Sequence, residues 1–355
     1  MPLTNPIAKT ELILGNSNKR FSGVTSTMLQ VLSRQWSLLP VAVLGGHFLP
    51  KQATAISFLS LVKHGRSPLA DGRFRIFHAR RNNEMIQALI LKTLFRVKIK
   101  IVFTSTAQRH HTGFTRWLIK QMDGIISTCD AAAGYLERPA DIIIPHGIDT
   151  NVYYPSENKD ESWAKLGLPG KYGIGILGRV RQQKGLDRLI DAAIPLLKKH
   201  PDFTIVITGQ VQSKDQAYFD EQLKKVEQAG LQQQVVYLGE LPFAQIPALV
   251  RSMSIIAALS RNEGFGLTVL EAMASGVAVL TSDAGAWPEV VRNGIDGYTV
   301  SSNNNQVLSD TLAKMLESPE TLHTMGAQGR QRIEQYYTIE REAECLVNYF
   351  KTLNQ

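Results

Sequence analysis

The chain of 355 residues lacks several features that would assign it to a specialised class of protein. Its two cysteines, Cys129 and Cys345, lie far apart without a CxxC spacing, which argues against a disulfide framework or a zinc site. The longest apolar runs, such as Ser254–Leu259, fall far short of the ~20 residues that span a bilayer. The first residues, Met1 to Pro6, lack a basic region followed by an apolar stretch, so we expect no secretory signal. These absences favour a globular protein with reduced thiols in the cytoplasm.

Acidic residues are scarce in the first half of the chain. Residues 1–150 hold 8 Asp and Glu against 19 Lys and Arg, a balance of +11. The remaining residues hold 23 acidic and 20 basic residues, a balance of −3, and the two sum to the net charge of +8. Such an asymmetry points to an anionic partner of the first half, and both nucleic acid and an anionic membrane fit at this stage.

Short apolar runs alternate with amphipathic ones in both halves, which is typical of parallel strands joined by helices. The expected strands are 11–14, 38–44, 73–77, 98–104, 124–128, 141–144, 172–177, 203–208, 235–238, 254–259 and 277–280. The expected helices are 25–34, 83–95, 114–122, 186–199, 216–229, 246–252 and 267–275. A segment rich in turn formers, 145–155, separates the two series. We therefore predict an α/β protein of two doubly wound domains, 1–145 and 146–337, with ligands bound at strand carboxyl ends in the cleft that the domains face.

A first motif, Gly178-Arg179-Val180-Arg181-Gln182-Gln183-Lys184-Gly185, lies between an expected strand and an expected helix. Gly178 would allow a sharp turn, after which Arg179 and Lys184 would project beside the amides of a helix N-terminus. A planar guanidinium and a point charge together suit a diphosphate. The spacing is not that of a Walker loop, and a solvated basic loop is the alternative reading.

A second motif combines Glu263 and Glu271 with the glycine-rich turn Gly264-Phe265-Gly266. The glycines allow backbone to approach a ligand, and a helix starting at Leu267 would point its amides at the same place. A carboxylate accepts two hydroxyl hydrogen bonds, so Glu271 suits a ribose diol and Glu263 suits sugar hydroxyls. Alternatively, Glu263 caps the helix and Glu271 is a surface residue.

No Asp-x-Asp pair and no cluster of residues with metal-ligand spacing is present in the sequence. A transferase without a divalent cation must neutralise a leaving diphosphate with its own charges, and Arg179 and Lys184 could do so. We therefore expect neither a metal nor a cofactor, only a nucleotide-sugar substrate.

The motifs carry a resemblance to a known family, in conserved order and spacing over most of residues 142–300. The runs that carry it are His146-Gly147-Ile148-Asp149 with Tyr153 and Pro155, Gly178-Arg179 with Lys184-Gly185, Glu263 to Gly276, and Gly285-Ala286-Trp287-Pro288-Glu289 with Gly294 and Gly297. They resemble glycosyltransferase family 4, which are retaining enzymes of GT-B fold with a Glu-x7-Glu signature. The resemblance implies that Arg179 and Lys184 hold the diphosphate, Glu263 contacts the donor sugar and Glu271 binds the ribose. It also implies that a final helix, about Glu340–Leu353, returns to the N-terminal domain, giving it residues of about 338–355.

The first half resembles the branch of lipopolysaccharide core mannosyltransferases. The resemblance lies in the glycine loop Asn16–Thr27, which contains Gly23, in His78–Glu84 and in Thr104–Trp117. It implies GDP-mannose as donor, bound with help from Gly23, and an acceptor of the Kdo–lipid A type on the first domain. The acceptor or cleft residues suggested in this way are His78, Arg80, Arg81, Gln108, Arg109 and His146. Such an enzyme would work peripherally on the cytoplasmic face of the inner membrane.

Some alternatives remain open. Many family members carry a histidine where this chain reads Thr104-Ser105-Thr106, which leaves open the roles of His110, His111 and His78; a lone histidine is more often structural. The donor could be a UDP-sugar and the acceptor another lipid-linked or soluble sugar, as in sucrose or trehalose synthesis. A sugar-nucleotide epimerase lacks support in the sequence, and a nucleic-acid-binding protein would explain the basic half but neither glutamate.

Basic residues near the middle of the first half suggest a membrane-facing surface. They are Arg73, Arg75, Arg80, Arg81, Lys92, Arg96, Lys98 and Lys100. The segment Phe58–Val62, followed by Lys63 and Arg66, suggests an interfacial stretch. The alternative is an ordinary solvated basic face with a buried apolar stripe.

Overall fold

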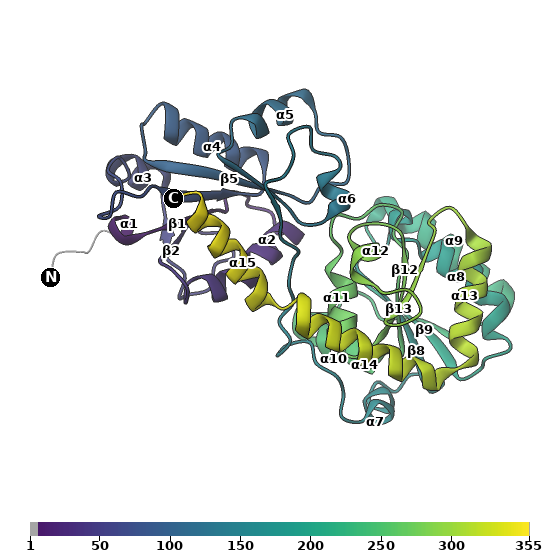
Figure 1. Ribbon diagram of the computed structural model, residues 1–355. Helices are drawn as coiled ribbons and strands as arrows, with labels where there is room; N and C mark the ends of the chain where they lie inside the picture. The colour runs from purple at the N-terminus through teal and green to yellow at the C-terminus, as the bar shows by residue number, and fades with distance from the viewer. Residues whose placement is uncertain (1–5, 355) are drawn as a thin grey trace. The chain divides into compact units, whose positions relative to one another are not determined.

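A computed structural model describes residues 6–354 and divides the chain into two compact units. The first unit runs to Gly147 and resumes at Ile339, and the second comprises Ile148–Thr338. Each unit is a parallel sheet with helices on both faces (Figure 1). Two doubly wound domains are therefore present, and the contact boundary falls after Gly147 instead of after residue 145. Residues 1–5, on which the expectation about a secretory signal partly rests, lie outside the described residues.

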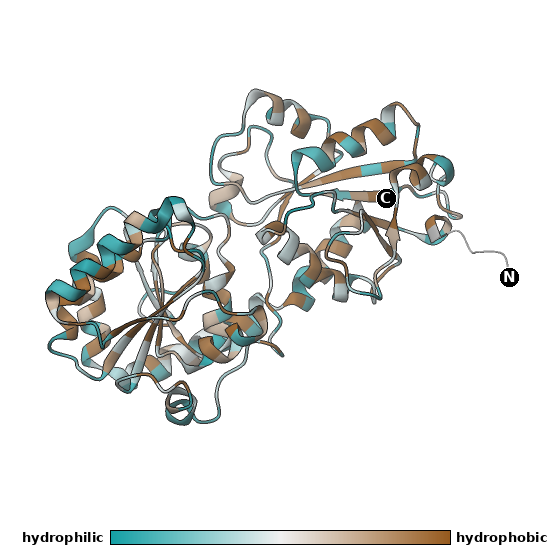
Figure 2. Cartoon of the chain, turned by 180° about the vertical axis from the view of Figure 1, so that it is seen from behind, coloured by the Kyte–Doolittle hydropathy of each residue, from teal (hydrophilic) through white to brown (hydrophobic). Residues whose placement is uncertain are grey.

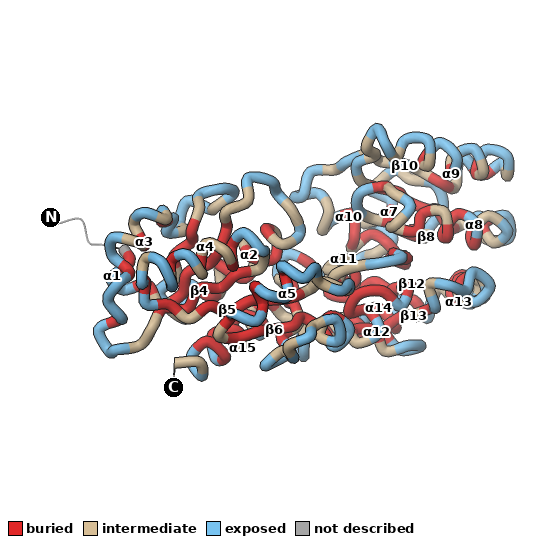
Figure 3. Tube along the Cα trace, turned by 90° about the horizontal axis from the view of Figure 1, so that it is seen from above, coloured by how far each residue is buried: buried red, intermediate tan, exposed pale blue. Residues whose placement is uncertain are grey.

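The first unit is built on a seven-stranded parallel sheet. Its strands, in spatial order, are β3 (Ala55–Ile56), β2 (Val41–Leu44), β1 (Leu12–Gly15), β4 (Arg75–Ala79), β5 (Ile99–Ser105), β6 (Gly124–Ser127) and β7 (Ile142–Ile143). Its helices are α1 (Pro6–Lys9), α2 (Gly23–Gln35), α3 (Phe58–His64), α4 (Asn82–Thr93), α5 (Gly113–Lys120), α6 (Asp130–Ala133) and α15 (Ile339–Thr352). The central strands are buried along their length (Figure 3), so their carboxyl ends can position polar side chains.

The two faces of this sheet carry separate apolar cores because side chains alternate along a strand. Leu12, Ile76 and Val102 point to the face covered by α2 and α15. Ile13, Phe77 and neighbouring residues point to the face covered by α1, α3, α4 and α5. The strand register therefore fixes which residues of each strand face α15.

Helix α15 closes the first unit although it ends the chain. Its buried residues, including Leu346 and Phe350, join the core formed with α2. The hydroxyl of Tyr349 donates a hydrogen bond to Asp141 Oδ2 at 2.6 Å, and the ammonium of Lys100 donates to the carbonyl of Leu353. The amphipathic last helix thus completes the layer on one face of the first sheet.

The second unit is built on a six-stranded parallel sheet. Its strands, in spatial order, are β10 (Val235–Tyr237), β9 (Phe203–Thr208), β8 (Tyr172–Leu177), β11 (Ile255–Ala258), β12 (Ala278–Ser282) and β13 (Gly297–Val300). Its α-helices are α7 (Lys159–Ala164), α8 (Leu186–Leu197), α9 (Gln216–Ala229), α10 (Ile246–Ser252), α11 (Leu267–Ala274), α12 (Trp287–Val290), α13 (Asn305–Glu317) and α14 (Pro319–Tyr336). Short 3₁₀ turns are η1 (Gln182–Lys184), η2 (Ser213–Asp215) and η3 (Phe243–Gln245). Figure 2 shows mostly apolar strands between helices of mixed hydropathy, as expected for a buried parallel sheet.

Some elements differ from the expected ones for local reasons. Strand β2 starts at Val41 instead of Leu38, because the amides of Leu38 and Leu39 bond back to the carbonyl of Gln35 at 2.9 and 3.1 Å. The expected pattern contained neither β3, which is two residues long, nor β13. It also lacked the helices α1, α3, α6, α7, α12, α13 and α14. Two of these elements contain motif residues, because α12 includes Trp287 to Glu289 and β13 starts at Gly297.

Candidate functional site

Three loops of the second unit leave the carboxyl ends of neighbouring strands. They follow β8, β11 and β12, which lie side by side in the sheet. The first loop contains Gly178 to Gly185, the second contains Glu263, and the third contains Gly285. Because parallel strands end at one edge, the structure brings both sequence motifs together in one unit.

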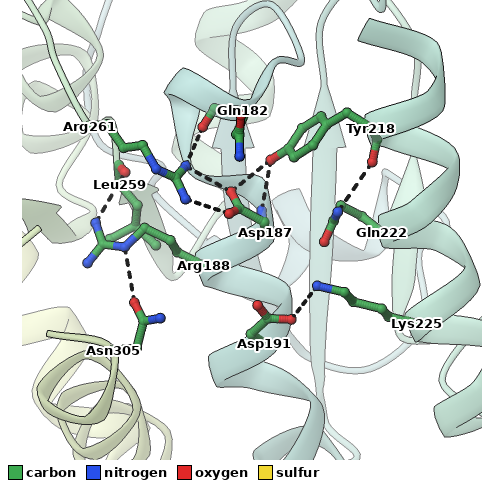
Figure 4. A network of polar contacts seen from close by, with 10 residues as sticks. All are labelled: Gln182, Asp187, Arg188, Asp191, Tyr218, Gln222, Lys225, Leu259, Arg261 and Asn305. Carbon is green, nitrogen blue, oxygen red and sulfur yellow. Dashed lines mark hydrogen bonds and ion pairs between the residues drawn. The ribbon is translucent and has the colours of Figure 1, made fainter. Parts of the chain in front are cut away.

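Polar contacts fix the β8 loop against the β11 loop (Figure 4). The amide of Arg261 donates to the carbonyl of Gln183 at 2.8 Å, and Gln183 Nε2 donates to the carbonyl of Asn262 at 2.7 Å. The guanidinium of Arg261 binds both oxygens of Asp187, at 3.0 and 2.6 Å. The hydroxyl of Tyr218 donates to Asp187 Oδ1 at 2.8 Å. The first turn of α8 is therefore locked to the loop that carries Glu263.

Lys184 and Glu263 meet between these loops. The Lys184 ammonium forms an ion pair with Glu263 Oε2, and the hydroxyl of Ser260 donates to the same oxygen at 3.2 Å. The two side chains remain 24% and 20% exposed. Glu263 does not cap α11, because the N-cap is Gly266 and no side chain caps it. A cation and a carboxylate are thus held together within reach of a ligand.

Glycine is required where the β11 loop enters α11. Gly266 has a φ of +86°, and a Cβ there would lie 2.3 Å from Trp287 Nε1. That indole nitrogen donates to the carbonyl of Gly266 at 3.0 Å, while Phe265 is buried below the loop. Gly285 faces the same loop, since its Cβ would lie 2.9 Å from the carbonyl oxygen of Phe265. Backbone can therefore approach a ligand closely beside Gly264 and the first amides of α11 at Leu267.

Glu271 lies in the second turn of α11 and is partly buried. Burial raises the pKa of this carboxyl to about 7, although a hydrogen bond from Tyr153 and the charge of Lys184 lower it. Tyr153 is itself buried, and Arg330 donates to its carbonyl at 2.8 Å. The carboxylate is thus a poorly solvated acceptor that hydroxyl groups of a ligand would stabilise.

Arg179 is the least engaged of the predicted residues. It follows Gly178, whose φ of +110° provides the predicted sharp turn. Its side chain is exposed and has no partner in the described part of the chain. Close by, a Cβ on Gly209 would lie 2.1 Å from the carbonyl of Gly178, so backbone packs tightly under the turn. Arg179 is free to meet an anion that arrives at this edge.

At the corresponding edge of the first unit, the predicted histidines are buried. His78 Nε2 lies 2.7 Å from Thr104 Oγ1, and its ring packs edge-on against Phe350. Burial, with the nearby charges of Arg80 and His146, holds the pKa of His78 well below its usual value. His146 Nδ1 lies 2.8 Å from Glu342 Oε1, whose second oxygen accepts from the amide of Gly147 at 2.8 Å. Both rings serve as internal partners in the folded unit.

Arg80 and Arg81 flank the buried carboxylate of Glu84. The amide of Arg80 donates to Glu84 Oε2 at 2.7 Å, and Arg81 Nη1 donates to Oε1 at 2.9 Å. Arg81 Nη2 also donates to Ser22 and Thr25, at 2.9 and 2.8 Å. Burial lowers the pKa of Arg80 and raises that of Glu84. These contacts fix the segment next to Gly23 and the start of α2.

The remaining predicted residues of this edge lie in the loop between β5 and α5. Gln108 Nε2 lies 3.8 Å from Cys129 Sγ, and Arg109 is exposed. His111 Nε2 lies 3.4 Å from Ser105 Oγ, and the ring of His110 packs edge-on against Tyr135. Gly23 opens α2, and a Cβ there would meet nothing within 4 Å. Among the residues singled out at this edge, Gly23, Arg109 and His110 are exposed.

The basic residues near the middle of the first half do not form one exposed face, so that expectation is wrong in part. Arg75 is buried and donates to the carbonyl of Ile7, and Lys92 pairs with Asp123 at 2.6 Å. Arg73 pairs with Asp71 and Glu11. Arg73, Arg75 and Lys92, like Arg80 and Arg81, contact groups of the protein itself and so stabilise the fold instead of facing solvent as one patch.

Two further observations concern absences. Among residues 6–354, no three His, Cys, Asp or Glu side chains are grouped as a metal site. No described helix combines the length and apolarity needed to cross a membrane.

The two doubly wound units and the paired glutamate and basic motifs at one strand edge define a two-domain transferase of GT-B type. Residues 158–332 match the family model of glycosyl transferases group 1. The chain is 38% identical to the lipopolysaccharide core biosynthesis mannosyltransferase LpcC of Rhizobium leguminosarum bv. viciae, over 98% of this chain and 97% of that relative. The chain is also 38% identical to the lipopolysaccharide core biosynthesis mannosyltransferase LpsB of Rhizobium meliloti, over 98% of this chain and 99% of that relative. The chain belongs to the group 1 family and is a glycosyltransferase, which confirms the predicted family.

Solved structures support the same assignment. The C-terminal domain of a group 1 family protein, LpcC of Francisella tularensis, is 40% identical, with a TM-score of 0.53 over 54% of this chain and 100% of that one. The Anabaena protein Alr3699/HepE, solved with UDP, has a TM-score of 0.80 over 97% of this chain and 100% of that one, at 17% identity. The second likeness shows the fold alone.

Several residues of the site were not found by sequence reasoning. Tyr153 was read as part of a linker, yet it faces Glu271. Asp187, Tyr218 and Arg261 form the clamp between the loops. Ser260 supports Glu263 from three residues upstream, and such spacing in a loop carries no periodic signal. The contacts of Tyr153 and of the clamp join residues far apart in the sequence, so only the folded structure reveals them.

Proposed function

We propose that this enzyme transfers mannose from GDP-mannose to the inner core of lipopolysaccharide, with retention at the anomeric carbon. The observation that carries the proposal is the 38% identity to two core mannosyltransferases over nearly the whole chain. The second unit, residues 148–338, would bind the donor and the first unit the acceptor. No metal or cofactor is part of the proposal.

The donor site would work through four side chains of the second unit. Arg179 and Lys184 would bind the diphosphate, Glu263 the hexose hydroxyls and Glu271 the ribose. The bond between the anomeric carbon and the phosphate oxygen breaks, and its electron pair leaves with the nucleoside diphosphate. The acceptor hydroxyl forms the new bond on the same face and gives its proton to the departing phosphate. Charge grows on that phosphate, so the cations act mainly in the transition state.

The acceptor would be an anionic glycolipid of the Kdo–lipid A type. The exposed Arg109 and the loop around Gln108 lie at the carboxyl edge of the first sheet, where parallel α/β units bind ligands. Arg80, Arg81, His78 and His146 would shape that edge from beneath. We also propose that the enzyme contacts the cytoplasmic face of the inner membrane peripherally, and that it does not bind nucleic acid.

The experiment is a donor panel with core-truncated lipopolysaccharide as acceptor. GDP-mannose should give a mannosylated product, and transfer from a UDP-sugar in its place would reject the proposed donor. In parallel, GDP should raise the melting temperature more than UDP does, and DNA should not change it. Stabilisation by DNA alone would favour the nucleic-acid alternative.

A further inference from the structure

Two leucines of the first unit are unusually exposed. Leu59 in α3 is 77% exposed, and Leu94 at the end of α4 is 71% exposed. Their neighbours Phe58 and Phe95 are in edge-to-face contact, with ring centroids 5.8 Å apart. The leucines therefore extend from two adjoining segments whose neighbouring residues Phe58, Val62 and Phe95 pack against the core.

Four cations accompany these leucines. Lys63 follows Leu59 on α3 and Arg66 follows the end of that helix, while Arg96 and Lys98 follow Leu94. The amide of Lys98 donates to the carbonyl of Gly65 at 2.9 Å, which brings the two segments together. All four side chains are exposed, and across residues 6–354 none has a carboxylate partner. We call these six residues, Leu59, Lys63, Arg66, Leu94, Arg96 and Lys98, the basic–leucine patch.

Arg96 adopts a backbone conformation that favours glycine. Its φ is +57°, and the amide of Val97 bonds back to the carbonyl of Leu91 at 2.9 Å as the chain leaves α4. A residue with a Cβ is strained in this left-handed region, so glycine would be the favoured choice for the turn alone. An arginine there places another exposed charge on the patch, and such strain is characteristic of functional positions.

A second apolar pair on the same side of the sheet is less suited to an anionic partner. Phe114 and Trp117 of α5 stack with centroids 6.1 Å apart and are 56% and 55% exposed. However, the adjacent Arg116 and Lys120 both pair with Glu137. The charge beside the aromatic pair is partly neutralised, whereas the basic–leucine patch keeps its four charges.

We propose that the basic–leucine patch docks the enzyme on an anionic membrane, with the leucines in the interface and the cations on lipid phosphates. Stable peripheral attachment requires an apolar and an electrostatic contribution, and the patch provides both. This inference rests on the proposed membrane contact and specifies its surface. The patch contains no residue assigned to donor or acceptor binding.

The test is co-sedimentation of the full-length protein with vesicles, without donor or acceptor. Binding should be strong with mixed phosphatidylcholine and phosphatidylglycerol, weak with phosphatidylcholine alone, and reduced by salt. The double variant Arg66→Gln/Arg96→Gly should bind about 25-fold more weakly, at about fivefold for each cation lost. Leu59→Ser/Leu94→Ser should weaken binding by about tenfold. Arg96→Gly should not lower the melting temperature, because glycine suits the turn.

Matched controls separate the patch from general charge and apolarity. Lys224→Gln removes an exposed cation from α9 of the second unit, and Phe114→Ser/Trp117→Ser removes the aromatic pair; neither should change vesicle binding. The proposal is overturned if the wild type ignores anionic vesicles, if the patch variants bind normally, or if the aromatic variant loses binding instead. Transfer to a water-soluble acceptor fragment is measured separately, so failure of the proposed reaction is distinguishable from failure of docking.

Discussion

The carboxyl edges of the two sheets differ in how they use their charges. In the second unit, Arg179 is exposed and has no partner among the residues that the structure describes, and Lys184 and Glu263 remain partly exposed. In the first unit, His78 and His146 are buried against protein partners. The predicted charges of the second unit's edge therefore stay available for a ligand. At the first unit's edge only Arg109 of the predicted charged residues is exposed, and the other predicted polar groups hold the elements of the unit in place.

The difference follows from how each edge is built. The second unit's site needs two loops that the sheet brings together and a glycine at each sharp turn. The first unit's edge needs a carboxylate from the last helix, since Glu342 lies 196 residues from His146. A substitution should thus reduce catalysis at the edge of the second unit and reduce stability at the edge of the first unit.

The largest expected effect is on catalysis at the carboxyl edge of the second unit's sheet. Lys184→Ala should lower turnover by about 10²–10³-fold, because a charge that stabilises the leaving diphosphate is lost. The affinity for the intact nucleotide-sugar donor should fall much less, since the bridging phosphate oxygen carries less charge in the donor than in the transition state. Steady-state kinetics and calorimetric binding measure the two effects.

The matched control for Lys184→Ala is Lys224→Ala, an exposed lysine on α9 of the same unit. It should leave both quantities unchanged. Equal losses of turnover and affinity in Lys184→Ala would show that the lysine binds both states alike.

The same contrast explains what the sequence could predict. The strands 172–177 and 203–208 and the two motifs are local patterns, and they appear in the structure where expected. Tyr153 could not be assigned, because its contact with Glu271 joins a turn-rich segment to a distant helix. The sequence places Arg75 and Lys92 in a basic surface cluster, because sequence spacing does not reveal the burial of the first or the pairing of the second with Asp123. The sequence thus predicts the local motifs, but it does not predict contacts between residues that are far apart along the chain.

The next effect concerns the stability of the first edge. Glu342→Ala should lower the free energy of unfolding by about 2–3 kcal/mol, because it leaves the buried amide of Gly147 without an acceptor. Glu340→Ala, on the same helix, removes only the partly exposed pair with Arg34 and should cost about 1 kcal/mol or less. Arg179→Ala should change stability by less than about 0.5 kcal/mol. Denaturant titration compares the three, and similar costs for Glu342→Ala and Arg179→Ala would remove the distinction between the edges.

A smaller effect tests the clamp that aligns the two loops. Asp187→Asn keeps the shape of the side chain but weakens its paired contact with Arg261, so kcat should fall about tenfold. KM for the donor should change less, because Lys184 and Glu271 remain. Asp191→Asn is the matched control on the next turn of α8, where the carboxylate contacts only Lys225 in Figure 4. If both variants lose activity equally, α8 as a whole matters and the clamp does not.

The smallest effect concerns titration, in which the two edges should also differ. Because burial raises the pKa of Glu271 to about 7, its carboxyl is largely protonated at pH 6 and ionised at pH 8. A ribose diol donates to the ionised form, so nucleoside diphosphate affinity should rise about three- to tenfold between these pH values. Glu271→Gln should remove the part of this rise that comes from the carboxyl, leaving only the part that comes from titration of the ligand's phosphates, which both proteins share. Tyr153→Phe removes a hydrogen bond that lowers the pKa of Glu271, so the midpoint of the rise in affinity should move to higher pH.

His78 stays neutral between pH 6 and pH 8 because burial lowers its pKa. A rise in Glu271→Gln larger than the phosphates explain would therefore have to come from another group.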